Sequence, residues 1–333
     1  MVDVARSAGV SQATVSLILN GSPGARFSAT TRNHVKRVAE ELGYTLVRRS
    51  KRRASSDRTI IGFIADEVTT DPWIALAFEG AREKALEYGY TVSLTISRGD
   101  REIEALALDQ FSQQPVLGVI YGTILTRKII PSAALLKYRA VLLNCYASDR
   151  LLPSVVPGDL VGGRVATERL IRSDRSRIGL INGQQGLDAS RDRLKGYRQA
   201  LASNDIAFDP ELVRPGNWEP SSGYEMTHVL MALKSPPDAI FCANDMMAVG
   251  CYDALRELGF RIPHDVSVIG YDDRDIAQYL RPPLTTLVLP QREMGMIAAE
   301  ILIDQAAGLE VGPTQIKAEC PIVERASVAP VVS

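Results

Sequence analysis

The hydrophobic pattern divides the chain into a short helical start and a long alternating body. Within residues 2–20, apolar positions recur at helical spacing on two short segments that Gly9 separates. Glycine adopts the left-handed turn that ends a helix at little cost, so a helix–turn–helix is expected. A third helix is expected at about residues 28–42. The apolar positions that would pack this three-helix head are Val4, Ala5, Ala8, Val10, Val15, Ile18, Leu19, Val35, Val38, Ala39 and Leu42.

From Thr59 onward, short apolar strands alternate with helices, a pattern typical of parallel sheets covered on both faces. The alternation restarts near residue 158, so the α/β core should contain two doubly wound parallel-sheet subdomains. Strands are expected at 60–65, 90–96, 116–121, 140–144, 154–156, 178–182, 239–243 and 266–271. Helices are expected at 73–88, 101–113, 132–138, 162–172, 191–204, 224–233 and 245–258.

The charge distribution sets the head apart from the body. Residues 1–58 carry eleven Lys and Arg against four Asp and Glu, a net +7, so residues 59–333 carry −8 of the chain's −1. Five of the six residues from Arg48 to Arg53 are basic. A basic head on an acidic body favours contact with nucleic-acid phosphates. The alternatives are an ordinary pair of helices followed by a solvated basic linker.

Several other functional classes lack their sequence signals. No apolar run approaches the length of a membrane span, and no signal segment opens the chain, so a cytoplasmic protein is expected. There is no Gly-rich phosphate loop after the first strand, no GxSxG motif and no metal-ligand spacing. We therefore expect no catalytic residues, no metal and no cofactor. The cysteines and histidines support this expectation because each stands alone in the sequence. They are Cys145, Cys242, Cys251, Cys320, His34, His228 and His264.

Motifs along nearly the full chain resemble the LacI/GalR family of bacterial transcription regulators. They are DVARSAGVSQATVSLILNG at 3–21, ELGY at 41–44, RLKGYRQAL at 193–201, FCANDMMAVG at 241–250, IPHDVSVIGYDD at 262–273 and PPLTTL at 282–287. The resemblance implies a helix–turn–helix DNA-binding domain at 1–45, a basic hinge at 46–58 and an effector-binding core at 59–333. That core would be similar to periplasmic binding proteins. Its N-subdomain would comprise about 59–157 plus 288–317, and its C-subdomain about 158–287 plus 318–330.

The resemblance also implies which residues meet DNA. Gln12 and Ala13 match the principal base-reading positions, and glutamine can pair with adenine. Thr14 and Ser16 match phosphate contacts, which orient the head without reading bases. Arg53 stands where relatives place a leucine wedge, so an arginine could enter the minor groove instead. The full predicted DNA-binding set is Ser11, Gln12, Ala13, Thr14, Ser16, Asn20, Arg48, Arg49, Lys51, Arg52 and Arg53.

For the effector, Arg193, Asn244 and Asp272 match the residues that hold ligand in this family. A carboxylate and a guanidinium suit a polyhydroxylated ligand, and an aromatic ring suits a sugar face. The predicted effector-binding set is Asp71, Trp73, Arg193, Trp218, Asn244 and Asp272. Arg193 could instead be a surface helix residue, and Trp218 a plain core residue.

Further expectations concern the positions around this set. Asp245 is expected to cap its own helix, and Asp273 to face away from the ligand. Leu289 stands where many relatives have glutamine. Crossings between the subdomains are expected near residues 157–159, 285–289 and 317–321.

The resulting hypothesis is a DNA-binding transcription regulator, most simply a repressor, whose operator affinity changes when a sugar or glycoside binds between the subdomains. The resemblance implies a homodimer on a near-palindromic double-stranded operator, with contacts from residues 245–258 and 275–280, and no membrane partner. The alternative is a sugar-binding transport protein, against which the basic head argues. An enzyme is the weakest alternative.

Overall fold

The chain folds as two compact units, Met1–Arg53 and Ala54–Ser333. The structure, a computed structural model, describes residues 29–41, 59–69, 73–309, 312 and 314–331, together with six positions before them. Those six are Val4, Ser7, Ala8, Val10, Thr14 and Val15.

In the first unit, the described apolar positions share one small core. Helix α3 (Ala29–Glu41) supplies Val35, Val38 and Ala39, and they pack with Val4 and with other buried residues of the first two segments. Val15 is fully buried in the same core. The expected apolar faces of the three segments are confirmed at these positions. Ala5, Ile18, Leu19 and Leu42 lie outside the described residues.

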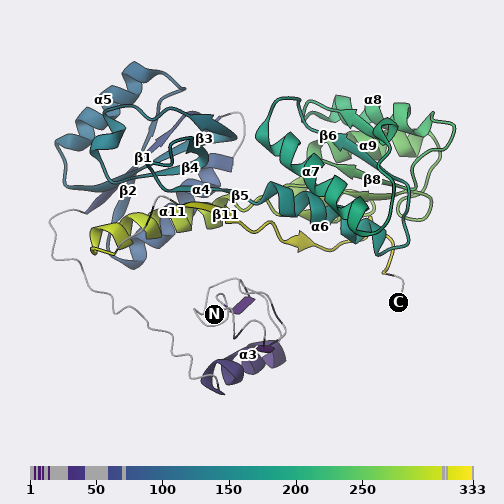
Figure 1. Cartoon of the computed structure of the whole chain (residues 1–333), viewed down its shortest axis with the longest axis horizontal. Helices are drawn as coiled ribbons and strands as arrows, with labels where there is room; N and C mark the ends of the chain where they lie inside the picture. Colours follow the sequence, from purple (N-terminus) through teal and green to yellow (C-terminus); the bar gives the residue numbers. More distant parts are fainter. Residues whose placement is uncertain are drawn as a thin grey trace. The chain divides into compact units, whose positions relative to one another are not determined.

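The second unit begins with a lobe built on a six-stranded parallel sheet, in the order β11-β5-β4-β3-β1-β2 (Figure 1). Helices α4 and α11 cover one face of this sheet, and helix α5 covers the other. Its strands are β1 (Ile60–Ala65), β2 (Thr91–Ile96), β3 (Val116–Ile129), β4 (Ala140–Ala147), β5 (Ser154–Pro157) and β11 (Gln315–Ala318). Its helices are α4 (Trp73–Glu87), α5 (Arg101–Ser112), the short η1 (Leu135–Lys137) and α11 (Gln291–Ala306).

The second lobe has a four-stranded parallel sheet, in the order β7-β6-β8-β9. Helices α6 and α7 cover one face, and α8 and α9 the other. Its strands are β6 (Ile178–Asn182), β7 (Val213–Pro215), β8 (Ala239–Cys242) and β9 (Ser267–Ile269). Its helices are α6 (Asp159–Ile171), α7 (Asp188–Ser203), η2 (Pro210–Leu212), α8 (Pro220–Met231), α9 (Asp245–Glu257) and α10 (Asp275–Tyr279).

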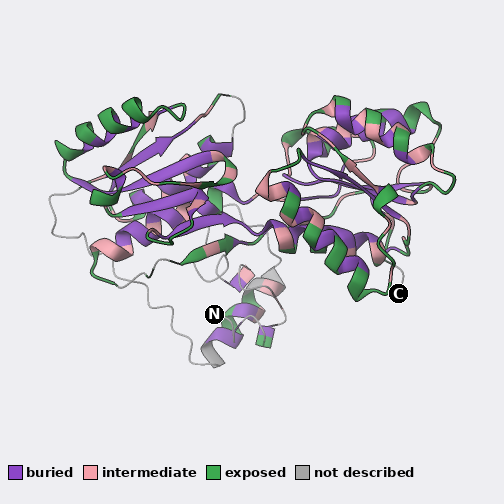
Figure 2. Cartoon of the chain, turned by 45° about the horizontal axis from the view of Figure 1, so that its top comes forward, coloured by how far each residue is buried: buried purple, intermediate pink, exposed green. Residues whose placement is uncertain are grey.

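The inner strands of both sheets are buried on both faces, whereas the edge strands β2 and β11 carry exposed residues (Figure 2). Strand β6, for example, is a run of five buried residues, which explains why it reads as continuously apolar rather than alternating. The helices show exposed and buried faces in turn. The predicted α/β class with two parallel sheets is therefore confirmed.

The chain passes between the lobes three times. It leaves the first sheet after β5, returns through the short strand β10 (Thr286–Leu287) into α11, and leaves again after β11. It ends beside the second lobe, where β12 (Ile322–Val323) pairs antiparallel with β10. These three crossings allow the lobes to close or open without unfolding either one.

Several predicted boundaries are wrong. Helices α6, α7 and α8 each begin three or four residues before the expected start, because a helix opens with polar residues or proline ahead of its first apolar contact. Pro220 opens α8 in this way. Strand β3 continues to Ile129, past the expected end at 121, because its later half is amphipathic. Helix α11 is not among the predicted elements.

Candidate functional site

Asp272 lies three residues after the end of strand β9, at the carboxyl edge of the second sheet, where parallel sheets bind ligands. The main chain fixes its place on both sides. Its N–H donates to the Leu287 carbonyl at 2.7 Å, and its carbonyl accepts from the Leu289 N–H at 3.3 Å. Its φ is +114°, in the region that favours glycine, so the crossover holds the backbone in a strained form. The side chain is buried.

Arg193, on α7, is only 3% exposed, so the surface alternative is wrong. Its Nε and Nη2 both lie 2.9 Å from Oδ1 of Asp159, the first residue of α6, and its Nη1 donates to the Ala243 carbonyl. Although burial disfavours the charged form, the Asp159 carboxylate holds the pKa of Arg193 above its ordinary value. Its guanidinium lies 3.6 Å from the ring centroid of Tyr271.

Asn244 caps α9, and the expectation that Asp245 does so is wrong. Asn244 Oδ1 accepts from the Met247 N–H at 2.8 Å, and its Nδ2 donates to the Trp218 carbonyl at 2.9 Å. Asp245 is instead fully buried, and it accepts from Thr286 Oγ1 at 2.6 Å. Burial, and then the charge of Asp272, raise the pKa of Asp245 well above its ordinary value.

Trp218 is half-buried and stands on a backbone with φ +74°. Its ring packs against Gly183, where an added Cβ would come within 1.9 Å of the indole, and its centroid lies 5.5 Å from the Arg193 guanidinium. Its Nε1 is buried and has no hydrogen-bond partner among the described residues. A buried N–H donor in this state is unfavourable unless a ligand or water accepts from it.

The first lobe contributes Trp73, the first residue of α4, which is 9% exposed. The guanidinium of Arg274, from the second lobe, lies 4.9 Å from the Trp73 ring centroid, and its Nε lies 3.6 Å from Asp272 Oδ2. Two predicted effector residues on different lobes therefore approach the same side chain. Asp71, two residues before Trp73, lies outside the described residues.

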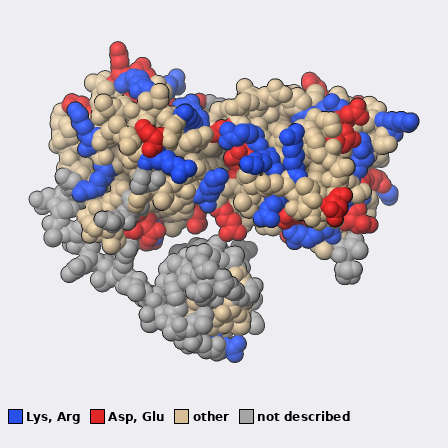
Figure 3. Space-filling view, viewed as in Figure 1, with Lys and Arg blue, Asp and Glu red and all other residues tan. Residues whose placement is uncertain are grey.

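A second contact joins the lobes at Tyr146, near the end of β4. Its hydroxyl donates to Oδ2 of Asp188, the first residue of α7, at 2.7 Å. This hydrogen bond, followed by burial, raises the pKa of Tyr146. The contact joins the carboxyl end of a first-lobe strand to the second lobe. Figure 3 shows charged side chains of both signs gathered where the two lobes meet on the face drawn.

Sequence reasoning missed Asp159, Tyr146, Asp188 and Arg274. Asp159 lies two residues after strand β5, and a charged residue at the carboxyl end of a buried strand was the available signal. Nothing in the local sequence marks the other three residues.

Leu289 packs among apolar residues of the second lobe, whereas Gln291, two residues later, is buried with no hydrogen-bond partner for its Oε1 among the described residues.

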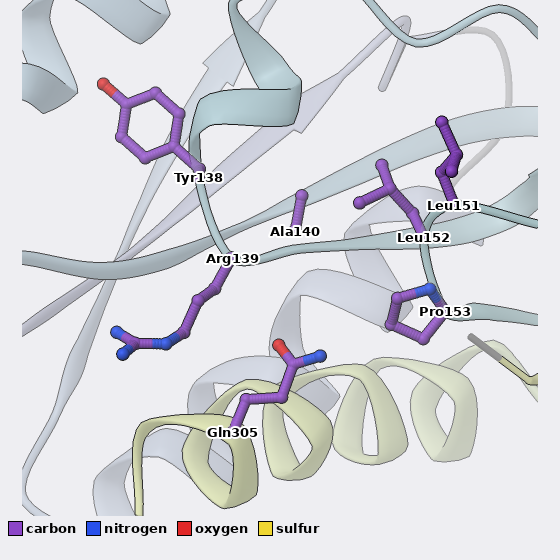
Figure 4. A pocket seen from close by; sticks show the side chains of 7 residues that line it. All are labelled: Tyr138, Arg139, Ala140, Leu151, Leu152, Pro153 and Gln305. Atoms are coloured by element: carbon purple, nitrogen blue, oxygen red, sulfur yellow. The ribbon is translucent and has the colours of Figure 1, made fainter. Parts of the chain in front are cut away.

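A cavity of about 310 Å³ lies elsewhere, at the amino ends of β4 and β5 (Figure 4). Its lining residues are Tyr138, Arg139, Ala140, Leu151, Leu152, Pro153 and Gln305. Figure 4 shows the Tyr138 side chain directed away from Gln305. Because open α/β sheets bind ligands at their carboxyl edges, this cavity is the weaker candidate.

Of the predicted DNA-binding residues, the structure describes Thr14, which is helical and half-buried. The others, Ser11, Gln12, Ala13, Ser16, Asn20, Arg48, Arg49, Lys51, Arg52 and Arg53, lie outside the described residues. Within the described ranges, no helix is long and apolar enough to cross a membrane. No group of His, Cys, Asp and Glu there could hold a metal ion.

A basic helical head followed by two parallel-sheet lobes, with buried polar groups where the lobes meet, defines a DNA-binding protein with a ligand-binding core. Two family models agree. Residues 1–45 match the bacterial regulatory proteins of the lacI family, and residues 167–328 match the periplasmic binding protein-like domain.

Individual proteins match along almost the whole chain. The HTH-type transcriptional repressor CytR of Escherichia coli (strain K12) is 32% identical, over 98% of this chain and 95% of its own. The transcriptional regulator CelR–cellobiose complex is 31% identical over 97% and 98%, with a TM-score of 0.67. The lac repressor dimer bound to operator and the anti-inducer ONPF is 27% identical over 98% of both chains, also with a TM-score of 0.67. The chain belongs to the LacI family and is a DNA-binding transcription regulator.

Proposed function

We propose that the protein is a transcriptional repressor, rather than an enzyme, whose operator affinity changes when a carbohydrate binds where its two lobes meet. One observation carries the proposal: the buried carboxylate of Asp272 lies beside Arg274, which contacts the Trp73 ring, and it interacts with Arg193, which contacts the Trp218 ring. A carboxylate accepts hydrogen bonds from sugar hydroxyls, and an aromatic ring packs on the apolar face of a sugar. The cellobiose complex of CelR supports this class of ligand.

The assembly belongs to the same proposal. A homodimer would place two heads on a near-palindromic operator in the cytoplasm, as the operator-bound lac repressor dimer suggests. Helix α10 exposes Tyr279 and Ile276 and is the stronger candidate for the dimer contact. Much of α9 is buried within its own lobe. In the head, Gln12 and Ala13 would read bases, while Thr14 and Ser16 would contact phosphates.

The test compares two neighbouring carboxylates, with cellobiose as the first probe and a panel of pentoses, glycosides and nucleobases after it. Calorimetry should detect binding to the intact protein, and the sugar should shift operator affinity in a gel-shift assay. Asp272→Asn should abolish the shift at the same sugar concentration. Asp273→Asn is the control, because Asp273 pairs with Arg325 at 2.6 Å.

A normal sugar response in Asp272→Asn would contradict the site. Binding without any change in operator affinity would contradict the regulatory role of the sugar and favour a plain binding protein.

A further inference from the structure

Arg274 spans the two lobes from a backbone that is itself fixed. Its N–H donates to Asp245 Oδ2 at 2.8 Å, and it stands immediately before α10. Its side chain, 23% exposed, extends to Asp272 of its own lobe at 3.6 Å and to the Trp73 ring of the other lobe at 4.9 Å. One cation therefore contacts two of the residues to which the proposed function assigns the ligand.

The chemistry of the two contacts is the chemistry that a sugar would use. The guanidinium approaches the carboxylate by charge, and it lies over the aromatic ring as cations do in cation–π pairs. A sugar would donate hydroxyl groups to the same carboxylate and place an apolar face on the same ring. The Arg274 guanidinium and a sugar cannot cover the same face of the Trp73 ring at once.

We propose that Arg274 is an internal competitor of the effector, which holds the lobes together over Asp272 and Trp73 until ligand displaces it. This inference rests on the proposed function for the identity of the site. It predicts the direction in which effector affinity changes when Arg274 is removed. A group that must leave before ligand binds lowers the apparent affinity, so removing it tightens binding. A group that donates hydrogen bonds to ligand would do the opposite.

The first experiment needs no ligand, because Trp73 and Trp218 are the chain's two tryptophans. In a Trp218→Phe background, fluorescence reports Trp73 alone, and acrylamide is the probe of its accessibility. Adding Arg274→Ala should raise the quenching constant and shift the emission to longer wavelength. Arg274→Lys, which keeps a cation, should give an intermediate value.

Arg281→Ala is the matched control for this experiment, because the Arg281 guanidinium donates to the carbonyls of Tyr279 and Leu280 at the end of α10. Its quenching constant should equal that of the background. Equal quenching in the Arg274→Ala protein would overturn the inference, since Trp73 would then be covered without Arg274.

The second experiment measures cellobiose binding to the intact protein by calorimetry. Arg274→Ala should lower the Kd roughly three- to tenfold, the range expected for one partly exposed cation–π contact. An unchanged or higher Kd would overturn the inference. Binding by Arg274→Ala alone would support it. If no sugar of the panel binds either protein, the carbohydrate effector is contradicted, and the acrylamide result still decides whether Arg274 covers Trp73.

Discussion

The two lobes end their parallel sheets in buried polar side chains, but they use them differently. In the first lobe, Asp66 after β1, Thr123 in β3 and Asn144 in β4 bind mainly to the main chain of their own edge, and Asp66 also pairs with Arg127 of the same edge. In the second lobe, charged groups pair with one another around aromatic rings. The first arrangement fixes a loop. The second makes a surface on which a polar ligand can be recognised.

Asn144 shows the pattern of the first lobe. Its Nδ2 donates to the carbonyls of Thr123 and Ile124 at 2.9 and 3.0 Å, and its Oδ1 accepts from Thr126 at 2.5 Å. Asp66 accepts from the Ile124 N–H at 2.9 Å. These bonds fix the stretch of β3 where its register against β4 shifts, between Gly122 and Arg127. The hydrogen-bonding capacity of this edge is used internally.

In the second lobe, Arg193 and Asp159 form a buried ion pair. The Asp272 carboxylate lies near Arg274, whose side chain extends to the other lobe. The indole N–H of Trp218 is left for another acceptor. The second lobe should therefore recognise the polar groups of the ligand. The first lobe supplies mainly an apolar ring, Trp73.

The largest expected effect is that of Arg193→Ala, which would leave the Asp159 carboxylate buried without its cation. Breaking a buried ion pair from one side costs about 3–5 kcal/mol of unfolding free energy. Urea unfolding of the full chain should show this loss. Arg164→Ala is the control, because Arg164 pairs with Glu168 on the exposed side of α6, where a pair contributes about 0–1 kcal/mol.

If the two arginine variants were equally stable, the buried Arg193–Asp159 pair would contribute no more to stability than the exposed Arg164–Glu168 pair. The distinction between the lobes would then fail. A stable Arg193→Ala protein that had lost only its sugar response would return Arg193 to the role of a direct ligand contact.

The second effect is expected for Asn244→Ala, which removes the cap of α9 and the hydrogen bond to the Trp218 carbonyl. The free energy of unfolding should fall by about 1 kcal/mol. Asn244→Ser keeps a capping oxygen and removes the amide donor without adding a charge, so it should regain most of the stability measured by urea unfolding. If both variants were equally destabilised, the bond to Trp218 would matter more than the cap, and Asn244 would act chiefly by positioning the ring.

The sequence predicted what depends on local pattern. Strands β1 and β6 have the predicted bounds, because an uninterrupted apolar run bounded by polar residues marks a buried parallel strand. Helix starts were less accurate, since a helix begins before its apolar stripe does. The start of α6 matters here, because a helix predicted to begin at residue 162 leaves out Asp159, which is the first residue of α6.

Contacts between distant segments could not be predicted. Asp159 lies 34 residues from Arg193, and Trp73 is 201 residues before Arg274. Charge pairing cannot be assigned when dozens of acids and bases are available on the chain. The family resemblance implied that Arg193, Asn244 and Asp272 share one site, but it could not show that Arg274 approaches the Asp272 carboxylate.

The smallest expected effect tests whether the lobes are held together at their edges as well as through Arg274. Tyr146→Phe removes the hydrogen bond to Asp188, but Asp188 keeps its ion pair with Arg191, so the loss should be only about 0.5 kcal/mol, the low end for a hydrogen bond. Small-angle scattering of the ligand-free protein should show a slightly larger radius of gyration. Combining it with Arg274→Ala should enlarge the radius further, because the two contacts come from different segments.

Tyr224→Phe is the matched control for Tyr146→Phe, since it removes a tyrosine–carboxylate bond to Glu257 inside the second lobe. That change should leave the radius of gyration unaltered, although the same chemical group is lost. Equal radii for all the tyrosine variants would mean that Tyr146 stabilises its own edge only. The first lobe would then contribute Trp73 alone to closure, and the difference between the two edges would be greater than the structure indicates.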